Sequence, residues 1–249
     1  MTKVLQPLVD IMYSFIYVGL IILVIIFGII IISLILQNEK FKKSGYNAAT
    51  GNSFRKTRFN AGNYGEYLIF LILEKLPIYK RILANVYVPK GDGNTSEIDV
   101  VMISENGIFV FESKNYSGWI FGDEKSAMWT QSLKGGLKNR FYNPIKQNSS
   151  HIKALSKYID SFGLEVFKSY IVFSERCELK KVIVKLPNVA LIKRNNLIEV
   201  IKAEIIYTSF CLTQEQVDDI YNRLKIHTNV SEAEKLRHVQ SLKKKNKGD

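Results

Sequence analysis

The sequence predicts an α/β domain preceded by one membrane-spanning helix. An uncharged apolar run lies near the N-terminus, two strand-like runs joined by a turn signal lie near the middle, and helix signals alternate with strand signals after them. At 249 residues with 47% hydrophobic content, the chain is long enough for one domain of ordinary size and accessory segments. We therefore expect one folded domain behind a membrane anchor.

The first element is a predicted transmembrane helix at residues 11–36. This segment contains no charged residue and is rich in Ile, Leu, Val and Phe. At about 1.5 Å per residue, a helix of this length exceeds the hydrocarbon core of about 30 Å. A cleavable signal peptide would have a shorter apolar region that ends in small residues, whereas residues 37–43 read QNEKFKK. We therefore expect the segment to remain uncleaved.

Basic residues are distributed unevenly around this helix. Lys3 precedes it, whereas residues 37–60 contain Lys40, Lys42, Lys43, Arg55, Lys56 and Arg58. The positive-inside rule places the short segment 1–10 outside the cell membrane and the C-terminal domain in the cytoplasm, with a single pass. Residues 37–60 are also polar, which predicts a basic linker. Two interpretations of it stay open, a flexible tether and a contact for anionic headgroups near residues 39–58.

The charge and the cysteines limit the class of partner. The formal net charge is +12, and residues 1–36 contain only Lys3 and Asp10, so the basic excess follows the helix. Such an excess suits phosphate-rich partners, either nucleic acid or anionic lipid. Cys177 and Cys211 have no Cys or His at metal-ligand spacing, which predicts reduced thiols of a cytosolic domain. The richness in Ile, Lys and Asn suggests a bacterium with an AT-rich genome.

A predicted β-hairpin lies at the centre of the chain. Apolar runs at residues 98–103 and 108–111 flank Asn106-Gly107, the strongest short sequence signal for a two-residue turn. With that turn, Asp99 lies opposite Lys114, and Glu112 lies on the same face as both. Two carboxylates and a lysine then converge at the far end of an apolar hairpin, which suggests a metal site with a basic neighbour.

The same residues have a simpler interpretation. Charged residues at strand ends are commonly solvated, and Asp99 opposite Lys114 can be a cross-strand ion pair worth less than about 1 kcal/mol. The register is also conditional, because a three- or five-residue loop would move Asp99 to the other face. The hairpin taken alone leaves both interpretations open.

A helix and further strands surround the hairpin. The pattern predicts a helix at residues 61–76 with Asn60 or Asn63 near its start, a strand at 81–89 and a third strand at 117–121. Glu66 lies in the first turns of the helix, where the helix dipole favours any carboxylate. Trp119 and Trp129 are predicted to be packing anchors and not platforms for base stacking.

Downstream, Asn143-Pro144 predicts the start of a helix that runs to about residue 162. Gln147 and His151 lie four residues apart on one face near its start, where they are either structural or in contact with a phosphate. Strands are predicted at 167–173, 181–184 and 189–192, helices at 197–205 and 213–225, and a last helix from 231 followed by a disordered Lys-rich end at 243–249.

The ordered set of these residues resembles the nuclease-related domain (NERD), a branch of the PD-(D/E)xK nuclease superfamily. The resemblance covers about residues 60–175, within a domain expected at 61–227 that a basic C-terminal helix and tail at 228–249 follow. The residues that carry it are Gly65-Glu66, Glu97-Ile98-Asp99-Val100-Val101, Gly107-Ile108-Phe109-Val110, Glu112-Ser113-Lys114-Asn115, Gly118, Trp129, Asn143-Pro144, Gln147 and His151. One departure from the superfamily pattern is that Ile98, not Pro, precedes Asp99.

The resemblance implies a restriction-endonuclease-like mixed sheet flanked by helices. It also implies phosphodiester hydrolysis with Mg²⁺ (or Mn²⁺), for which carboxylates are suitable ligands. Asp99, Glu112 and the Ser113 carbonyl would hold the metal, and Lys114 would orient a water or offset negative charge. The implied roles of the remaining residues are support of the site or a second metal for Glu66, and positioning of the phosphate backbone for Gln147 and His151.

The predicted function is that of a membrane-anchored, metal-dependent nuclease acting on DNA or RNA at the cytoplasmic face. Two alternatives stay open: a non-cleaving module that binds nucleic acid or a protein partner, and a structural or signalling protein whose basic surface contacts lipid. The sequence contains no helix-turn-helix or zinc-finger pattern, so we expect little base specificity.

Overall fold

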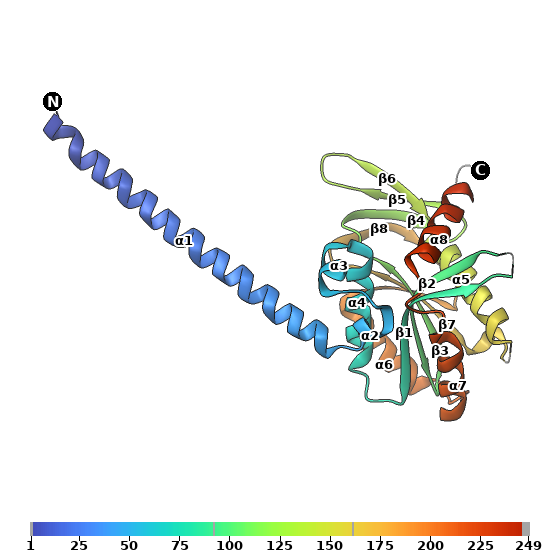
Figure 1. Ribbon diagram of the computed structural model, residues 1–249. Coiled ribbons are helices and arrows are strands. Elements are labelled where there is room, and N and C mark those ends of the chain that lie inside the picture. The colour runs from blue at the N-terminus through green and yellow to red at the C-terminus, as the bar shows by residue number, and fades with distance from the viewer. Residues whose placement is uncertain (1, 92, 161, 246–249) are drawn as a thin grey trace. The chain divides into compact units, whose positions relative to one another are not determined.

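The computed structural model describes residues 2–91, 93–160 and 162–245 and shows a long helix and a two-sheet α/β domain (Figure 1). The chain divides into two compact units, Met1–Ser44 and Gly45–Asp249. The second unit contains two mixed sheets with helices around them. The predicted α/β class is therefore confirmed, although the strands form two sheets instead of one.

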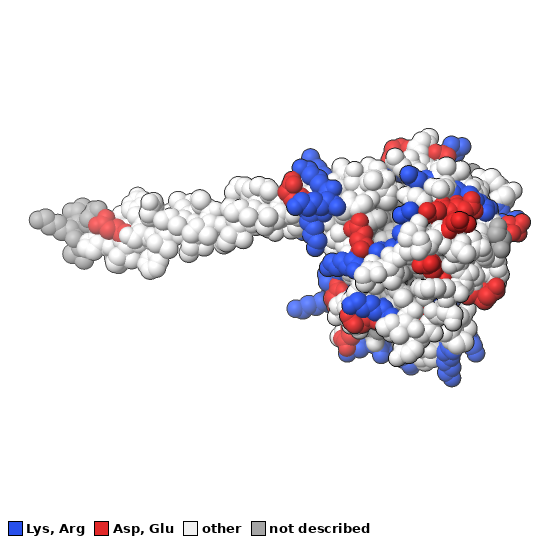
Figure 2. Space-filling model, turned by 90° about the horizontal axis from the view of Figure 1, so that it is seen from below, with Lys and Arg blue, Asp and Glu red and all other residues white. Residues whose placement is uncertain are grey.

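The first unit is the helix α1 (Thr2–Lys43), which extends the predicted 11–36 segment at both ends. The stretch Val9–Lys43 is long and apolar enough to cross a membrane, with a mean hydropathy of 3.4 in its most apolar window. Its surface lacks charge over most of its length, and Lys40, Lys42 and Lys43 lie in its last turn (Figure 2). A helix with a 1.5 Å rise per residue needs about 20 apolar residues to span a bilayer, so α1 has residues to spare.

The predicted linker at 37–60 is not a flexible tether. Its first part continues α1, and the rest forms the short helices α2 (Tyr46–Thr50) and α3 (Phe54–Phe59). Tyr46 is fully buried and packs edge to face against Tyr67 and Phe70 of α4 (Ala61–Glu74), with ring centroids 5.4 and 5.5 Å apart. Burial of this ring draws the segment into the compact unit that begins at Gly45.

A five-stranded sheet forms the centre of the domain, in the order β1-β2-β3-β7-β9. Its first three strands are antiparallel neighbours, and β7 and β9 join them in parallel. The strands are β1 (Lys80–Pro89), β2 (Thr95–Ser104), β3 (Gly107–Lys114), β7 (Phe167–Phe173) and β9 (Val189–Lys193). The helices α5 (Pro144–Ile159) and α7 (Gln214–Lys225) pack their buried leucines and isoleucines against one face, and α4 packs against the same three antiparallel strands.

A second sheet has four strands in the order β6-β5-β4-β8. Its strands are β4 (Gly118–Asp123), β5 (Met128–Ser132), β6 (Lys138–Tyr142) and β8 (Cys177–Ile183). Two of them follow strands of the first sheet along the chain, β4 after β3 and β8 after β7. The strand predicted at 181–184 begins earlier because Cys177 already pairs with Gly118. The inner face of this sheet packs on β7 and α5 through Ile120, Trp129 and Phe173.

The central hairpin forms with a register two residues away from the predicted one. Ser104 pairs with Gly107, so Glu105 and Asn106 occupy the turn in place of Asn106 and Gly107. Distant contacts explain the shift: the Asn106 side chain donates to the carbonyls of Ile205 and Thr208, at 3.2 and 2.8 Å. A shift of two residues leaves every side chain on its predicted face.

The C-terminal part contains α6 (Leu197–Tyr207), α7 and α8 (Glu232–Lys245). The predicted capping box is confirmed, because the Thr213 side chain accepts from the Gln216 amide and the Gln216 side chain accepts from the Thr213 amide. Residues 243–245 of the predicted disordered end belong to α8, and 246–249 lie outside the described residues.

Candidate active site

Glu112 is the most deeply buried charged residue of the site. Its side chain on β3 has no exposed surface, and Oε1 accepts from the Nζ of Lys114. Oε2 lies 3.2 Å from Nε2 of His151, but the two atoms are not aligned as a hydrogen bond. Burial alone would raise the pKa of Glu112, but Lys114 and His151 outweigh it and hold the pKa below its usual value.

Asp99 lies on the neighbouring strand β2. Its Oδ2 accepts a 2.7 Å hydrogen bond from the backbone amide of Ser113, which ties the end of β2 to the end of β3. Burial and the nearby carboxylates of Glu112 and Glu66 raise the pKa of Asp99 well above its usual value, against the opposing charge of Lys114. Like charges crowded in a buried space favour the binding of a cation.

Lys114 connects the hairpin to helix α5. Its Nζ contacts Glu112 and also donates to Oε1 of Gln147 at 3.1 Å. Although burial lowers the pKa of Lys114, Glu112 and Asp99 outweigh burial and raise it, so the ammonium stays charged. Gln147 reaches this position because Asn143 caps α5 and Pro144 occupies its first turn, as the sequence predicts.

Glu66 approaches the same cluster from α4. Its Oε2 accepts from Nδ2 of Asn85 at 2.6 Å and from the hydroxyl of Tyr46 at 3.2 Å. Burial and the neighbouring Glu97 and Glu112 carboxylates raise the pKa of Glu66 to about 7, although these two hydrogen bonds oppose the shift. The carboxylate therefore titrates near neutrality.

Gly65 permits this close approach of α4 to β3. A Cβ atom at Gly65 would lie 2.7 Å from Oγ of Ser113 and 2.9 Å from Cβ of Asn115. Both distances are shorter than real contacts, so a side chain here would push Glu66 away from the hairpin. The neighbouring Asn115 side chain donates to the Ala61 carbonyl at 2.7 Å and holds the start of α4 in place.

His151 lies behind Glu112 and is buried. Its Nδ1 is 2.8 Å from Oγ of Ser96, and its Nε2 faces Glu112. Both ring nitrogens are thus directed at protein groups. The predicted set of Glu66, Asp99, Glu112, Ser113, Lys114, Gln147 and His151 comes together in one cluster.

Two further residues belong to this cluster and were not predicted. Asn85 lies in the middle of β1 with φ of 52°. It links Glu66 to Asn52, because its Nδ2 donates to Glu66 and its Oδ1 accepts from Nδ2 of Asn52 at 3.4 Å. Asn is disfavoured inside strands but tolerates positive φ, so an Asn within a predicted strand is the one sequence signal that marks this position as unusual. Tyr46 lies in the segment interpreted as a linker, where nothing local indicates its contact with Glu66.

The donor atoms of the cluster fit a hard divalent cation. Within the part of the chain that the structure describes, no group of three or more His, Cys, Asp or Glu side chains is placed to hold a metal ion. Mg²⁺ does not need such a group, because it retains several waters and uses one or two carboxylates. Asp99 and Glu112 supply these, and the buried Oε2 of Glu112 has no aligned hydrogen bond that a cation would have to displace.

Comparisons with known proteins identify the family of the chain. The family model of the nuclease-related domain matches residues 61–174, a range that contains all seven predicted site residues. A Bacillus anthracis protein, described as uncharacterized, is 37% identical over 186 residues, which are 74% of this chain and 84% of that protein. No solved structure matches the chain. The chain belongs to the nuclease-related domain (NERD) family.

Proposed function

We propose that this protein is a membrane-anchored nuclease that hydrolyses phosphodiester bonds of DNA or RNA with a divalent metal ion. The observation that supports the proposal best is the continuous set of contacts from Asp99 through Ser113, Glu112 and Lys114 to Gln147. Carboxylates, a charged lysine and an amide at one strand end match the needs of phosphoryl chemistry. The nuclease-related family of the chain points to the same class of substrate.

Asp99 and Glu112, with the carbonyl of Ser113, would hold Mg²⁺ or Mn²⁺. When bound, such an ion polarises the scissile phosphate and lowers the pKa of a water. Ser113 has a second task, because its amide orients the Asp99 carboxylate. The carboxylates of Glu112 and Glu66 add to burial in raising the pKa of Asp99, and a bound cation would offset their repulsion.

Lys114 would offset the negative charge that develops on the phosphate. Its raised pKa keeps it protonated at neutral pH, and its bonds to Glu112 and Gln147 fix its direction in advance. Gln147, half-buried at the start of α5, would both hold Lys114 and donate its amide to a phosphate oxygen.

His151 and Glu66 have supporting parts in this proposal. The buried position of His151 between Ser96 and Glu112 favours a role in positioning Glu112 over direct contact with a phosphate. Glu66 is held by Asn85 and Tyr46 and would either support the site or take part in a second cation site.

The helix α1 would anchor the nuclease in the cell membrane. Its uncharged length fits a single span, and the basic side chains of its last turn would face anionic headgroups on the cytoplasmic side. Removal of residues 1–44 at the boundary between the two units tests the anchor. We expect the shortened protein in the soluble fraction, and its recovery in the membrane fraction would contradict a single anchor.

The decisive experiment is cleavage of labelled DNA and RNA by the full chain in detergent micelles, with Mg²⁺, Mn²⁺ or a chelator. Glu112→Gln and Lys114→Ala should abolish metal-dependent cutting, whereas Lys202→Ala, a change of an exposed lysine on α6, should not. A folded parent protein that binds nucleic acid but cuts neither substrate would contradict the proposal and favour a non-cleaving module.

A further inference from the structure

We propose that the outer face of the four-stranded sheet binds single-stranded nucleic acid by stacking bases on its aromatic side chains. This inference rests on the proposed function and deepens it, because it names the form of the substrate. The outer face comprises Trp119, Phe121, Lys138, Arg140, Tyr142 and Lys181, and Glu178 lies beside Trp119 on the same side.

The strand register places these side chains on one surface. Trp119 pairs with Ser132, which pairs with Lys138, and Phe121 pairs with Thr130, which pairs with Arg140. Paired residues of neighbouring strands point to the same side of a sheet. The alternate residues Ile120, Trp129 and Phe141 point inward and pack in the core, so the outer face is the side that the domain leaves uncovered.

The aromatic side chains of this face are accessible. Trp119 is 51% exposed and Tyr142 is 51% exposed, whereas Trp129 on the inner side is fully buried. The expectation that Trp119 is a packing anchor is therefore wrong. Nζ of Lys180 lies 5.4 Å from the centroid of the Trp119 ring, so a cation already occupies part of the ring's electron-rich surface.

Basic side chains outnumber acidic ones around the aromatic rings. Lys138, Arg140 and Lys181 make no ion pair with any acidic side chain in the described residues, whereas Lys180 pairs with Glu178 at 2.7 Å. Rings that stack on bases, interspersed with cations that contact phosphates, form the usual surface for single strands. A duplex hides its base faces and would leave the rings without partners, so charge and stacking together favour an unpaired strand.

The outer face begins where the candidate active site ends. The chain leaves the five-stranded sheet twice, after Lys114 and after Phe173, and enters β4 and β8 side by side. Two bonds hold these crossings together: the Ser174 amide donates to the Lys114 carbonyl at 3.1 Å, and the Gly118 amide donates to the Arg176 carbonyl at 3.2 Å. Trp119 therefore follows the catalytic lysine across one short crossing.

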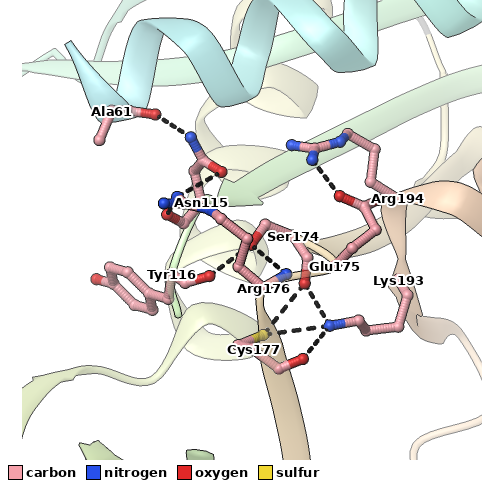
Figure 3. Close-up of polar contacts among 9 residues, drawn as sticks. All are labelled: Ala61, Asn115, Tyr116, Ser174, Glu175, Arg176, Cys177, Lys193 and Arg194. Carbon is pink, nitrogen blue, oxygen red and sulfur yellow. Dashed lines mark hydrogen bonds and ion pairs between the residues drawn. The ribbon is translucent and has the colours of Figure 1, made fainter. Parts of the chain in front are cut away.

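The crossing itself carries basic side chains. Figure 3 shows Arg176 directed at Asn115, to whose carbonyl its guanidinium donates at 2.8 Å, and Arg194 paired with Glu175. Lys193 lies beneath them and donates to the carbonyls of Ser174 and Cys177. The border between the two sheets therefore carries three basic side chains and one acidic one, an excess of positive charge that suits a strand passing from the outer face to Lys114.

The test is binding of a labelled oligothymidine and of a duplex of equal length to the full chain in neutral-lipid nanodiscs, with chelator present to prevent cleavage. We expect Trp119→Ala to weaken oligothymidine binding about tenfold and duplex binding less than twofold. The matched control is Tyr207→Ala, which removes an aromatic side chain that is 87% exposed on α6 and should change neither affinity. Unchanged oligothymidine binding by folded Trp119→Ala protein would overturn the proposal.

Tryptophan fluorescence distinguishes the nucleic acid from a lipid surface. Oligothymidine should quench the exposed Trp119, and the quenching should be lost in Trp119→Ala, since Trp129 is buried. A response of Trp119 to anionic lipid in the nanodisc, together with none to oligothymidine, would overturn the proposal in favour of a membrane contact.

Failure of this inference and failure of the proposed function have different signatures. If the parent protein binds oligothymidine through Trp119 in chelator but cuts neither DNA nor RNA with Mg²⁺, the proposed function fails while the outer face stands. If the parent protein cleaves with Mg²⁺ but folded Trp119→Ala binds oligothymidine as the parent does, the outer face fails while the proposed function stands.

Discussion

The two sheets of the domain follow the same plan but have different surroundings. Each contains three antiparallel strands to which parallel strands are added, β7 and then β9 beside β3 in one sheet and β8 beside β4 in the other. Helices α4, α5 and α7 pack against the first sheet, and one face of the second packs on the first sheet and α5. The strands β3 and β7 therefore end beside the buried charged cluster, and the strands that follow them, β4 and β8, have one open face.

This difference in burial changes the properties of the charged side chains in the two sheets. At the covered sheet, Asp99 and Glu66 have raised pKa values and Lys114 is held by two partners. At the open sheet, Trp119 and Tyr142 are each 51% exposed, and Lys180 pairs with Glu178 at the surface. In our proposals, hydrolysis uses the buried charges of the first sheet, and binding of a flexible single strand uses the exposed rings of the second. The following changes test that contrast, in order of decreasing expected effect.

The largest effect should come from the buried charges. Glu112→Gln or Lys114→Ala should lower metal-dependent cleavage by about 100-fold or more, because each removes a group that we propose to act on the metal or the phosphate. Single-turnover cleavage with saturating Mg²⁺ measures the loss, with circular dichroism as the control for folding. Parent-like cleavage by Glu112→Gln would show that the buried carboxylate is structural.

The two tryptophans should separate stability from binding. Trp129→Ala should lower the free energy of unfolding by about 3–5 kcal/mol, because the ring is fully buried and stacks 6.2 Å from Phe173. Trp119→Ala should lower it by less than about 1 kcal/mol, since that ring is half exposed. Urea unfolding of both variants measures the difference, and equal losses would contradict the assignment of the inner and outer faces.

A smaller effect should follow from the contact between α4 and β3. Gly65→Ala should cost about 1–3 kcal/mol of unfolding free energy and reduce cleavage, because the new Cβ would meet Oγ of Ser113 at 2.7 Å. The double change Gly65→Ala with Ser113→Ala should recover part of the stability by removing the nearest atom. If the double variant is no more stable than Gly65→Ala in urea unfolding, the contact with Ser113 is not the cause.

The smallest effect concerns the pH dependence that Glu66 adds to stability. Its folded pKa of about 7 exceeds the usual value of 4.5, so between these values the native state binds a proton that the unfolded state has lost. The contribution to stability is complete below 4.5 and disappears as the pH rises through 7.

Without divalent cations, the parent protein should lose roughly 1 kcal/mol of unfolding free energy between pH 6 and 8 from this group. Glu66→Gln should lack that part of the decline, which urea unfolding at both pH values would measure. An equal decline in the parent and the variant would assign the pH dependence to other groups.

Local signals in the sequence predict the elements well. The Asn60 and Asn143 caps, Pro144 and the Thr213 capping box all act within one helical turn, and each is present in the structure. The uncharged run in α1 and the two-residue spacing of Glu112 and Lys114 are likewise local features, which do not depend on residues far away in the sequence. Patterns whose partners lie within a few residues are readable before the chain folds.

Distant contacts decide the remainder. The hairpin turn moves to Glu105-Asn106 because α6 binds Asn106, and the segment interpreted as a linker folds because Tyr46 reaches α4 and Glu66. Trp119 and Trp129 are both aromatic residues on strands, yet only their place on the outer or inner side of one sheet makes one a surface and the other a core residue. Burial and register depend on which elements meet, and no stretch of local sequence contains that information.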